Sequence, residues 1–337
     1  MEKTDIQPIS IYVISAVALL INIFFIILYF LCPLRNINSY KYFFLITALQ
    51  NIIYTATFVL VIPRIISQDY SLIFIATGTV KYSLLAFNVL ILFVTVFICS
   101  IVSVTNSFVY RYLQLCRARL IQKYPSKVYV LVGFLVNFLV ILNFIIVIYF
   151  AFWPNEDFEQ LIWHSVEIPG INLKGVAFLG MSLKYNMSGF HLALVIDIAL
   201  VLAFMVSVNL FCALKIHGSL RNTLRNSQSL SLQRRMFVLL QLQACSPFVF
   251  LHIPCFFAFF LLFAEISSTP LITDIICTLM TLYPISNPII IVVFIKDYRD
   301  FLLYKLHLKQ SSERTVSSQI RSATTKSTRA PLPPIVT

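Results

Sequence analysis

The chain has 337 residues, of which 59% are hydrophobic and 11% are charged, and its mean hydropathy is +0.90. Soluble domains carry about 25% charged residues, so this composition excludes a soluble enzyme and a disordered protein. The formal net charge of +12 would suit a nucleic-acid binder, but the basic residues are confined to particular loops, which indicates membrane topology instead. Most of the chain is therefore expected to lie in lipid.

Charge-free runs predict seven transmembrane helices, because a helix needs about 20 apolar residues to cross a bilayer. Each run is long enough for one crossing and too short for two. The fifth run is interrupted by one charged residue, Asp197, and the apolar stretch 70–80 is assigned to an outer loop. The predicted spans are 6–34, 42–63, 82–110, 128–155, 185–214, 236–264 and 275–295.

The Lys and Arg residues predict the orientation, since short cytoplasmic loops are enriched in them. With the N-terminus outside, most of the 25 Lys and Arg residues fall in the inner loops and the C-terminal segment. The acids Glu156, Asp157, Glu159 and Glu167 fall in the longest outer loop. The sequence therefore predicts an extracellular N-terminus, a multi-pass protein of the plasma membrane, and basic inner loops that contact anionic membrane lipids.

The C-terminal part is predicted to contain a short amphipathic helix at 297–309, with Phe301, Tyr304 and Leu308 on one stripe. We expect it to lie on the inner membrane surface; the alternative is a continuation of the seventh helix into water. Residues 310–337 are rich in Ser and Thr, which is typical of a disordered cytoplasmic tail. This tail is either a phosphorylation target, with a receptor kinase and arrestin as partners, or an unmodified basic linker. The predicted organisation is an all-α membrane protein with a seven-helix domain at 1–309.

Enzyme chemistry finds no support in the sequence. The five His residues form no HExxH pair and the seven Cys residues form no CxxC pair, so we expect no metal and no cofactor. The seventh span contains no lysine, which excludes a retinal Schiff base. The sequon at Asn186 predicts a glycosylation site on the outer side, close to the fifth span.

Two polar residues within the spans are candidate ligand contacts. Asp197 is a charge inside a predicted helix, and charges at membrane depth are costly and usually functional. His252 lies at a broadly comparable depth in the sixth span. One interpretation is that both line or flank an outward-facing pocket, to which we also assign Asn88 and His191. The other is a polar pair that joins helices five and six.

Prolines cluster in the last two spans, at Pro247 and Pro254 in the sixth and at Pro284 and Pro288 in the seventh. Proline removes an intrahelical hydrogen bond and bends the helix. Helices six and seven are therefore the candidate moving parts of a switch. The alternative is that these are static kinks satisfied by packing.

Five short elements occur in order along the chain and at matching positions in the predicted topology. They are Ser39-Tyr40-Lys41-Tyr42, Phe108-Val109-Tyr110-Arg111-Tyr112, Leu232-Gln233-Arg234-Arg235-Met236-Phe237, Leu282-Tyr283-Pro284 followed by Asn287-Pro288, and Ile295-Lys296-Asp297-Tyr298-Arg299. With these elements the chain resembles nematode serpentine chemoreceptors of the str superfamily. The resemblance implies a seven-helix G-protein-coupled receptor that detects environmental chemicals in sensory neurons, with the sensory cilium as its expected location.

The resemblance also implies roles for particular residues. Arg111 looks like the arginine that contacts the heterotrimeric G protein at the end of helix three, with Tyr110, Tyr112, Arg234 and Arg235 beside it. Tyr110 stands where rhodopsin-like receptors carry an acid, so the usual adjacent ion pair is absent. The expected switch elements are Pro247, Pro254, Pro284, Asn287, Pro288, Tyr298 and Arg299.

The ligand is expected to enter from outside between helices three, five, six and seven. With 31 Phe and 16 Tyr residues in the chain, the pocket should be apolar and aromatic, which favours a small volatile or lipophilic odorant. The alternative function is a seven-span ligand-gated channel or transporter that works without a G protein. That alternative calls for a polar path through the bundle, and Asp197 alone offers a charge there.

Overall fold

The computed structural model describes residues 6–32, 41–123, 125–166, 168, 171–184, 188–222 and 228–305. Within this part of the chain, seven helical segments are long and apolar enough to cross a membrane, which confirms the predicted spans. They are α1 (Ile6–Leu31), α2 (Lys41–Val61), α3 (Ala86–Cys116), α5 (Ser126–Val147) with the π-helical turn η1 (Ile148–Phe152), α7 (Gly189–Asn222), α8 (Gln228–Pro247) with η2 (Phe248–His252) and α9 (Ile253–Phe263), and α10 (Pro270–Phe294).

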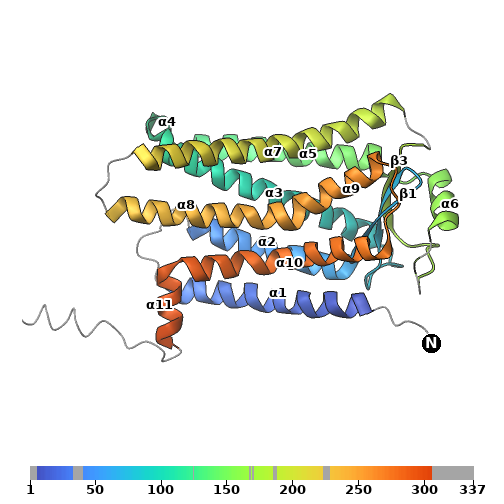
Figure 1. The fold of residues 1–337 in the computed structure, drawn as a ribbon, viewed down its shortest axis with the longest axis horizontal. Coiled ribbons are helices and arrows are strands. Elements are labelled where there is room, and N and C mark those ends of the chain that lie inside the picture. Colours follow the sequence, from blue (N-terminus) through green and yellow to red (C-terminus); the bar gives the residue numbers. More distant parts are fainter. Residues whose placement is uncertain are drawn as a thin grey trace, which may run out of the picture.

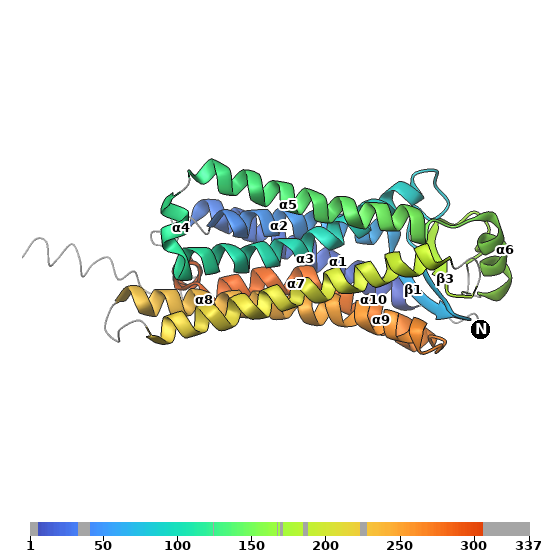
Figure 2. The same ribbon diagram turned by 90° about the horizontal axis from the view of Figure 1, so that it is seen from above.

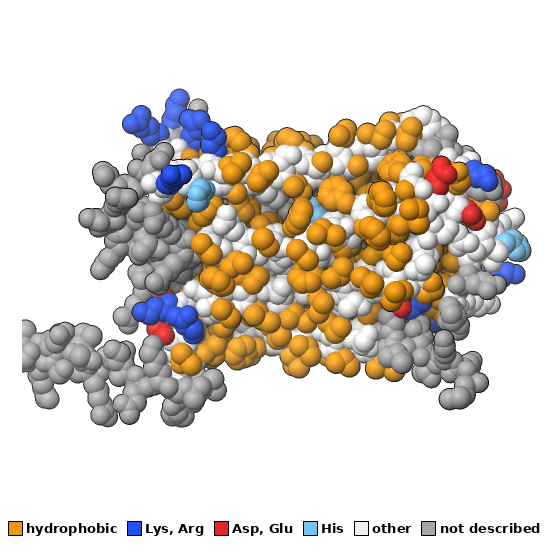
Figure 3. Space-filling view, viewed as in Figure 1, with side chains coloured by type: hydrophobic (Ala, Val, Ile, Leu, Met, Phe, Trp, Pro, Cys, Tyr) orange, Lys and Arg blue, Asp and Glu red, His pale blue; other side chains and the backbone are white. Residues whose placement is uncertain are grey.

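The spans run side by side as one elongated bundle (Figures 1 and 2). Apolar side chains cover its flank, and Lys and Arg gather at the end that carries the predicted inner loops (Figure 3). On the peripheral helix α5, Leu131, Phe134 and Phe138 are each more than half exposed. Such a surface is stable only against hydrocarbon, so the bundle has the outside of a membrane protein.

Several helices extend beyond the predicted spans at the inner end. Helix α3 runs to Cys116, so Arg111 lies inside the helix rather than at its end. Helix α7 continues to Asn222, and α8 begins at Gln228. The predicted outer start of span three, at residue 82, is wrong, because α3 begins at Ala86. Hydropathy marks where lipid contact stops, whereas backbone hydrogen bonding continues into the polar segments.

A three-stranded antiparallel sheet covers the outer end of the bundle, which the prediction of a purely helical chain did not include. Its strands, in the order β1-β2-β3, are β1 (Pro63–Gln68), β2 (Ser71–Ala76) and β3 (Phe178–Ser182). The stretch 70–80 therefore does lie outside the spans, but as part of a sheet. The two-residue turn between β1 and β2 is made by Asp69 and Tyr70, with φ of 46° and 62°. Neither is the glycine that usually marks such a turn.

Each face of the sheet is covered. Along β2, Leu72 packs on the bundle core, and the alternate residues Ile73 and Ile75 face a second small core. That second core includes Phe158 of the short helix α6 (Glu156–Ser165). Gly180 of β3 lies beneath it, where a Cβ atom would be 2.9 Å from the Phe158 ring. The sheet and α6 thus form two layers over the outer end of the bundle. We call these two layers together the roof.

At the inner end, α11 (Lys296–Lys305) runs across the bundle instead of extending α10 (Figure 1). The chain turns at Ile295, whose ψ is 110°. Tyr298 anchors α11, because it is fully buried and its ring lies 5.7 Å from that of Phe25 in α1. The structure therefore confirms the predicted separate helix after span seven and not a straight continuation of that span. The short helix α4 (Ala118–Lys123) follows α3 at the same end.

Several predictions concern residues outside the described part of the chain. These are the sequon at Asn186, the end of the amphipathic helix at Leu308, and the tail 310–337. Arg234 and Arg235 lie within α8, but their side chains are not described. Their proposed roles stay predictions.

Candidate functional site

An apolar cavity lies in the outer half of the bundle. It encloses about 680 Å³ of space, including its open side. Five of the seven spans contribute to its wall, and the roof contributes one residue from each strand. The lining residues are Val94, Phe97 and Ile98 (α3), Phe144, Ile148 and Phe152 (α5 and η1), Ile198 and Leu202 (α7), Cys255 and Phe259 (α9), Met280 (α10), and Ile65, Phe74 and Leu179 (roof).

Irregular helical turns shape two walls of this cavity. The π-helical turn η1 carries Ile148 and Phe152, both of which line it. In helix six, η2 immediately precedes α9, which supplies Cys255 and Phe259. A π-helical turn bonds residue i to residue i+5, and such turns occur frequently at functional sites. These two turns lie in spans four and six.

The roof is bound to the outer ends of helices six and seven. The Ser268 N–H donates to the Ser67 carbonyl at 2.7 Å, and the Thr273 hydroxyl donates to the Ile65 carbonyl at 3.1 Å. The Tyr70 hydroxyl bonds to Glu265, and this hydrogen bond raises the pKa of the Tyr70 phenol. The sheet therefore forms part of the cavity wall and is a bonded part of the bundle.

None of the four predicted ligand contacts is among the residues that line the cavity. Asp197 accepts a 2.7 Å hydrogen bond through Oδ2 from Asn143 Nδ2, so it joins α7 to α5. His191 bonds through Nδ1 to the Ser188 hydroxyl in the first turn of α7. Asn88 is exposed at the outer end of α3. The partner of Asp197 is thus helix four, and the structure gives it no hydrogen bond to His252 among the described residues.

His252 is placed closer to the cavity. Its side chain is 4% exposed, and Nδ1 lies 3.2 Å from the Pro247 carbonyl oxygen. Nε2 has no hydrogen-bond partner among the described residues. Cys255 and Phe259, which line the cavity, follow at spacings of three and seven residues, so the three side chains share one helix face. His252 therefore lies one turn inward of the cavity.

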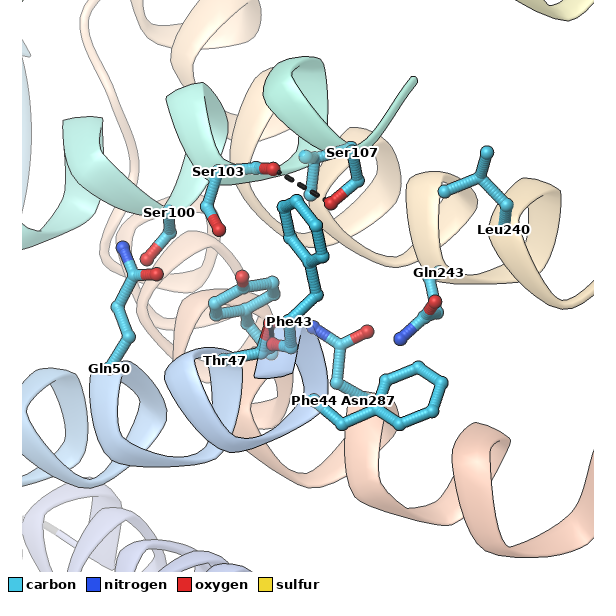
Figure 4. A pocket seen from close by; sticks show the side chains of 12 residues that line it. Phe43, Phe44, Thr47, Gln50, Ser100, Ser103, Ser107, Leu240, Gln243 and Asn287 are labelled. Carbon is cyan, nitrogen blue, oxygen red and sulfur yellow. Dashed lines mark hydrogen bonds between the residues drawn. The ribbon is translucent and has the colours of Figure 1, made fainter. Parts of the chain in front are cut away.

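A second pocket, of about 380 Å³, lies further inward and is polar (Figure 4). Its amide and hydroxyl side chains come from α2, α3, α8 and α10. Asn287 Oδ1 is buried there without a hydrogen-bond partner in the described chain. The Tyr283 hydroxyl is hydrogen-bonded to Ser100 and Asn287. The polar lining residues are Thr47, Gln50, Ser100, Ser103, Ser107, Gln243, Tyr283 and Asn287.

The prolines of helix seven are satisfied by side chains of helices one and two. Pro288 has no N–H, so the Pro284 carbonyl lacks its partner within α10. Asn22 Nδ2 donates to that carbonyl at 2.9 Å, and Asn51 Nδ2 approaches it at 3.4 Å. In the same way Pro284 leaves the Met280 carbonyl free, and this oxygen accepts from the Tyr54 hydroxyl at 3.2 Å. Helix seven is thereby tied to its neighbours at both breaks.

Among the side chains that the structure describes, helix six has fewer such ties. Its contact with helix seven includes a hydrogen bond between the hydroxyls of Ser246 and Ser286. The Pro247 carbonyl is bonded by His252 of the same helix, across the wide turn η2. The two proline-bearing helices, which the sequence presents alike, therefore differ. Helix seven is fixed to other helices, whereas the hydrogen bond at the bend of helix six is internal to it.

At the inner end, three of the expected G-protein residues, Tyr110, Arg111 and Tyr112, lie in α3 shortly before its end at Cys116. Arg111 Nη1 donates to Gln114 Oε1 at 3.2 Å. The Tyr110 ring lies 5.4 Å from that of Phe43 in α2. The Tyr112 ring contacts Phe211 of α7, and its hydroxyl accepts from Arg117 Nε at 3.2 Å. An aromatic contact thus occupies the place of the acid that precedes this arginine in rhodopsin-like receptors.

Comparison with known proteins agrees with this architecture. The family model of the serpentine type 7TM GPCR chemoreceptor Str matches residues 7–303. A similar curated protein is the G-protein coupled receptor str-33 of Caenorhabditis elegans, which is 25% identical over 79% of this chain and 81% of that receptor. The match extends from the first span into α11, and the chain therefore belongs to the Str family of serpentine seven-transmembrane G-protein-coupled chemoreceptors.

Proposed function

We propose that this chemoreceptor detects a small lipophilic molecule, which binds in the outer apolar cavity. The observation that carries the proposal is the cavity lining, which consists of aliphatic and aromatic side chains, one Met and one Cys. Such a lining offers dispersion contacts and no charged partner, so it favours a ligand whose surface is mainly apolar. The aromatic content of the sequence supports the same ligand class.

The cavity is well placed to act on helix six. Cys255 and Phe259 belong to the short outer segment α9, which is joined to α8 through η2 and Pro247. A ligand that binds one arrangement of α9 more tightly than another shifts the population of that arrangement. Because helix seven is tied to α1 and α2, we propose that the inner part of helix six moves relative to α3 and α7.

The output is then proposed to leave at the inner end, where Arg111 with Tyr110, Tyr112, Arg234 and Arg235 contacts a heterotrimeric G protein. The basic inner loops support this by attracting both an acidic partner and anionic lipid. Phosphorylation of the tail by a receptor kinase, followed by arrestin binding, would end the signal. The proposed location is the plasma membrane of a sensory-neuron cilium.

The experiment is an odorant panel on cells that express the chain with a chimeric Gα subunit, at matched surface levels of each variant. Ile98→Trp fills the cavity, and Leu200→Trp adds the same bulk to a side chain of α7 that is 63% exposed to lipid. We expect Ile98→Trp to abolish the response and Leu200→Trp to preserve it. A full response of Ile98→Trp would refute the cavity as the ligand site.

The same cells test the output. Arg111→Ala should retain ligand binding and lose G-protein activation. If a ligand-evoked current or flux persisted in this variant and in cells without any Gα subunit, the proposed coupling would be refuted.

A further inference from the structure

We propose that the ligand reaches the apolar cavity sideways from the membrane, by passing between the outer parts of helices five and six. This inference rests on the proposed function of the cavity and specifies the route of its ligand. We call the passage the α7/α9 seam, and the residues on its two sides are Ile198, Ala199, Phe256 and Phe259. A receptor with this entry responds to molecules that have first dissolved in the outer leaflet of the bilayer.

The first step is the wall on the outer side of the cavity. There the roof supplies Ile65, Phe74 and Leu179 to the lining. Behind this layer, Ile73 and Ile75 pack in the second small core together with α6. Strand β1 is also hydrogen-bonded to the outer end of helix seven. A molecule that arrived from water would have to part these bonded layers.

The second step compares the seams between the helices around the cavity. Asn143 Nδ2 donates to Asp197 Oδ2 at 2.7 Å and so joins α5 to α7. This bond lies at the level of the cavity, because the next residues, Phe144 and Ile198, line it. Among the residues that the structure describes, no hydrogen bond and no ring contact joins α7 to α9. Figure 2 shows the outer parts of these two helices running apart.

The third step is the exposure of the flanks of α9. Pro254 and Leu261, on one flank, are buried. On the opposite flank Phe256 is partly buried and Phe263 is 47% exposed. Helix α9 packs closely against α10 and the roof but not against α7, so the more exposed flank is the one that faces α7.

The α7 side of the seam carries a small residue. Ala199 follows Asp197 by two positions, which is about 200° around a helix, so it lies on the flank opposite the bond to α5. Ile198, between the two, lines the cavity. An alanine leaves the seam to be filled from the α9 side by Phe256 and Phe259. Rotation of these two side chains would open the path.

The surface outside the seam decides what enters. Large apolar side chains on both helices are exposed there, namely Ile196, Leu200, Phe257 and Phe260. Such a surface is covered by acyl chains, so the seam opens into hydrocarbon. Apolar molecules leave water for this phase, and the membrane therefore collects the ligand before the receptor binds it.

The test uses the full chain in lipid nanodiscs and a photoreactive probe, a diazirine-bearing octanol. Receptor and probe are mixed, photolysed by a flash after increasing delays, and analysed by mass spectrometry. The measured quantities are the rate and the plateau of incorporation at Met280, which lines the cavity and is 3% exposed. The rate reports the route, and the plateau reports the site.

Two neighbouring substitutions separate the seam from the lipid-facing surface. Ala199→Trp fills the seam, whereas Leu200→Trp adds bulk to a side chain that already faces lipid. Overpacking costs about 1–3 kcal/mol, so we expect Ala199→Trp to slow incorporation about tenfold at an unchanged plateau. Leu200→Trp should match the wild type. Equal rates in the two variants would overturn the inference.

A second probe distinguishes lipid from water in the unaltered receptor. The octyl diazirine is attached through a flexible spacer to a water-soluble dextran, which cannot enter the bilayer. We expect no incorporation of this probe at Met280. Incorporation equal to that of the free probe would reveal an aqueous route and overturn the inference.

The cavity itself is checked with Ile98→Trp, which should abolish the plateau of the free probe at Met280. A plateau like that of the wild type would refute the proposed function, and this inference would fail with it. If Ile98→Trp abolished the plateau and Ale199→Trp left the rate unchanged, only the route would be refuted.

Discussion

The hydrogen bond between Tyr54 and helix seven leads to a quantitative prediction. Tyr54→Phe removes only the hydroxyl that donates to the Met280 carbonyl at 3.2 Å. The ring stays in its aromatic cluster, where it lies 6.0 Å from Phe58 and 5.5 Å from Phe93. The loss leaves a buried carbonyl without a donor, because Pro284 supplies no N–H. We therefore expect the free energy of unfolding to fall by about 1–3 kcal/mol.

A second substitution tests this reasoning directly. In a Pro284→Ala background the new N–H of residue 284 can bond the Met280 carbonyl within the helix, so the Tyr54 hydroxyl is no longer its only donor. Tyr54→Phe should then cost at least about 1 kcal/mol less than in the wild type. The four proteins of this double-mutant cycle are compared by equilibrium unfolding in mixed detergent micelles. If Tyr54→Phe cost the same in both backgrounds, the assignment of the tyrosine to the proline-freed carbonyl would be refuted.

Three further predictions concern other parts of the molecule. Gly180→Ala should displace the Phe158 ring, since the added Cβ would lie 2.9 Å from it, and should reduce surface expression; normal expression would show that the roof tolerates the shift. Asp197→Asn should keep the response to odorants, because an amide oxygen can still accept from Asn143, whereas Asp197→Ala should lower thermal stability. If Asp197→Asn lost the response at a normal surface level, the negative charge would be required and the hydrogen bond alone would not explain the role of Asp197. Burial raises the pKa of the Tyr298 phenol in the folded protein. The stability that the buried neutral phenol contributes is therefore complete at pH values below the unfolded-state pKa of about 10 and is lost as the pH rises above that value. Tyr298→Phe should lack this alkaline decline in the unfolding midpoint, and an unchanged decline would contradict the role given to Tyr298.

The spans could be predicted from the sequence because the lipid requirement acts on each helix separately. Charge-free length identified six of them, and the fifth was identified although Asp197 interrupts it. The separate helix that contains Tyr298 was anticipated from its amphipathic pattern. The helix ends were harder to predict from the sequence. At the inner end of α3 the backbone continues past the apolar run to Cys116, where no hydropathy signal marks it.

The sheet was missed because its signals are weak. Strand β2 lies in an apolar stretch that also resembles the start of a span, and its turn contains Asp69 and Tyr70 in place of glycine. Strand β3 pairs with β2 from more than a hundred residues away in the chain. A partner at that distance leaves no local pattern in either segment.

In the candidate site, too, features with a local sequence signal could be predicted, whereas contacts between distant segments could not. Asp197 was identified because a charge in a span is conspicuous, but its partner Asn143 is on a different helix and could not be inferred from spacing. The cavity residues Phe97 and Met280 look like any core side chain in the sequence. Polar residues in otherwise apolar spans, such as Asn51, were a usable signal for the ties to helix seven.

The order of the roof strands along the chain has a consequence for biosynthesis. Its first two strands leave the ribosome before the third span, whereas β3 follows the fourth span, as the order of elements requires. Until then the β2 edge that will receive β3 carries unpaired backbone groups, and such an edge invites pairing with other chains. Closure of the sheet therefore marks the stage at which the first four spans are in place. Changes that delay insertion of the fourth span should prolong the aggregation-prone interval, even where they leave the finished receptor unaltered.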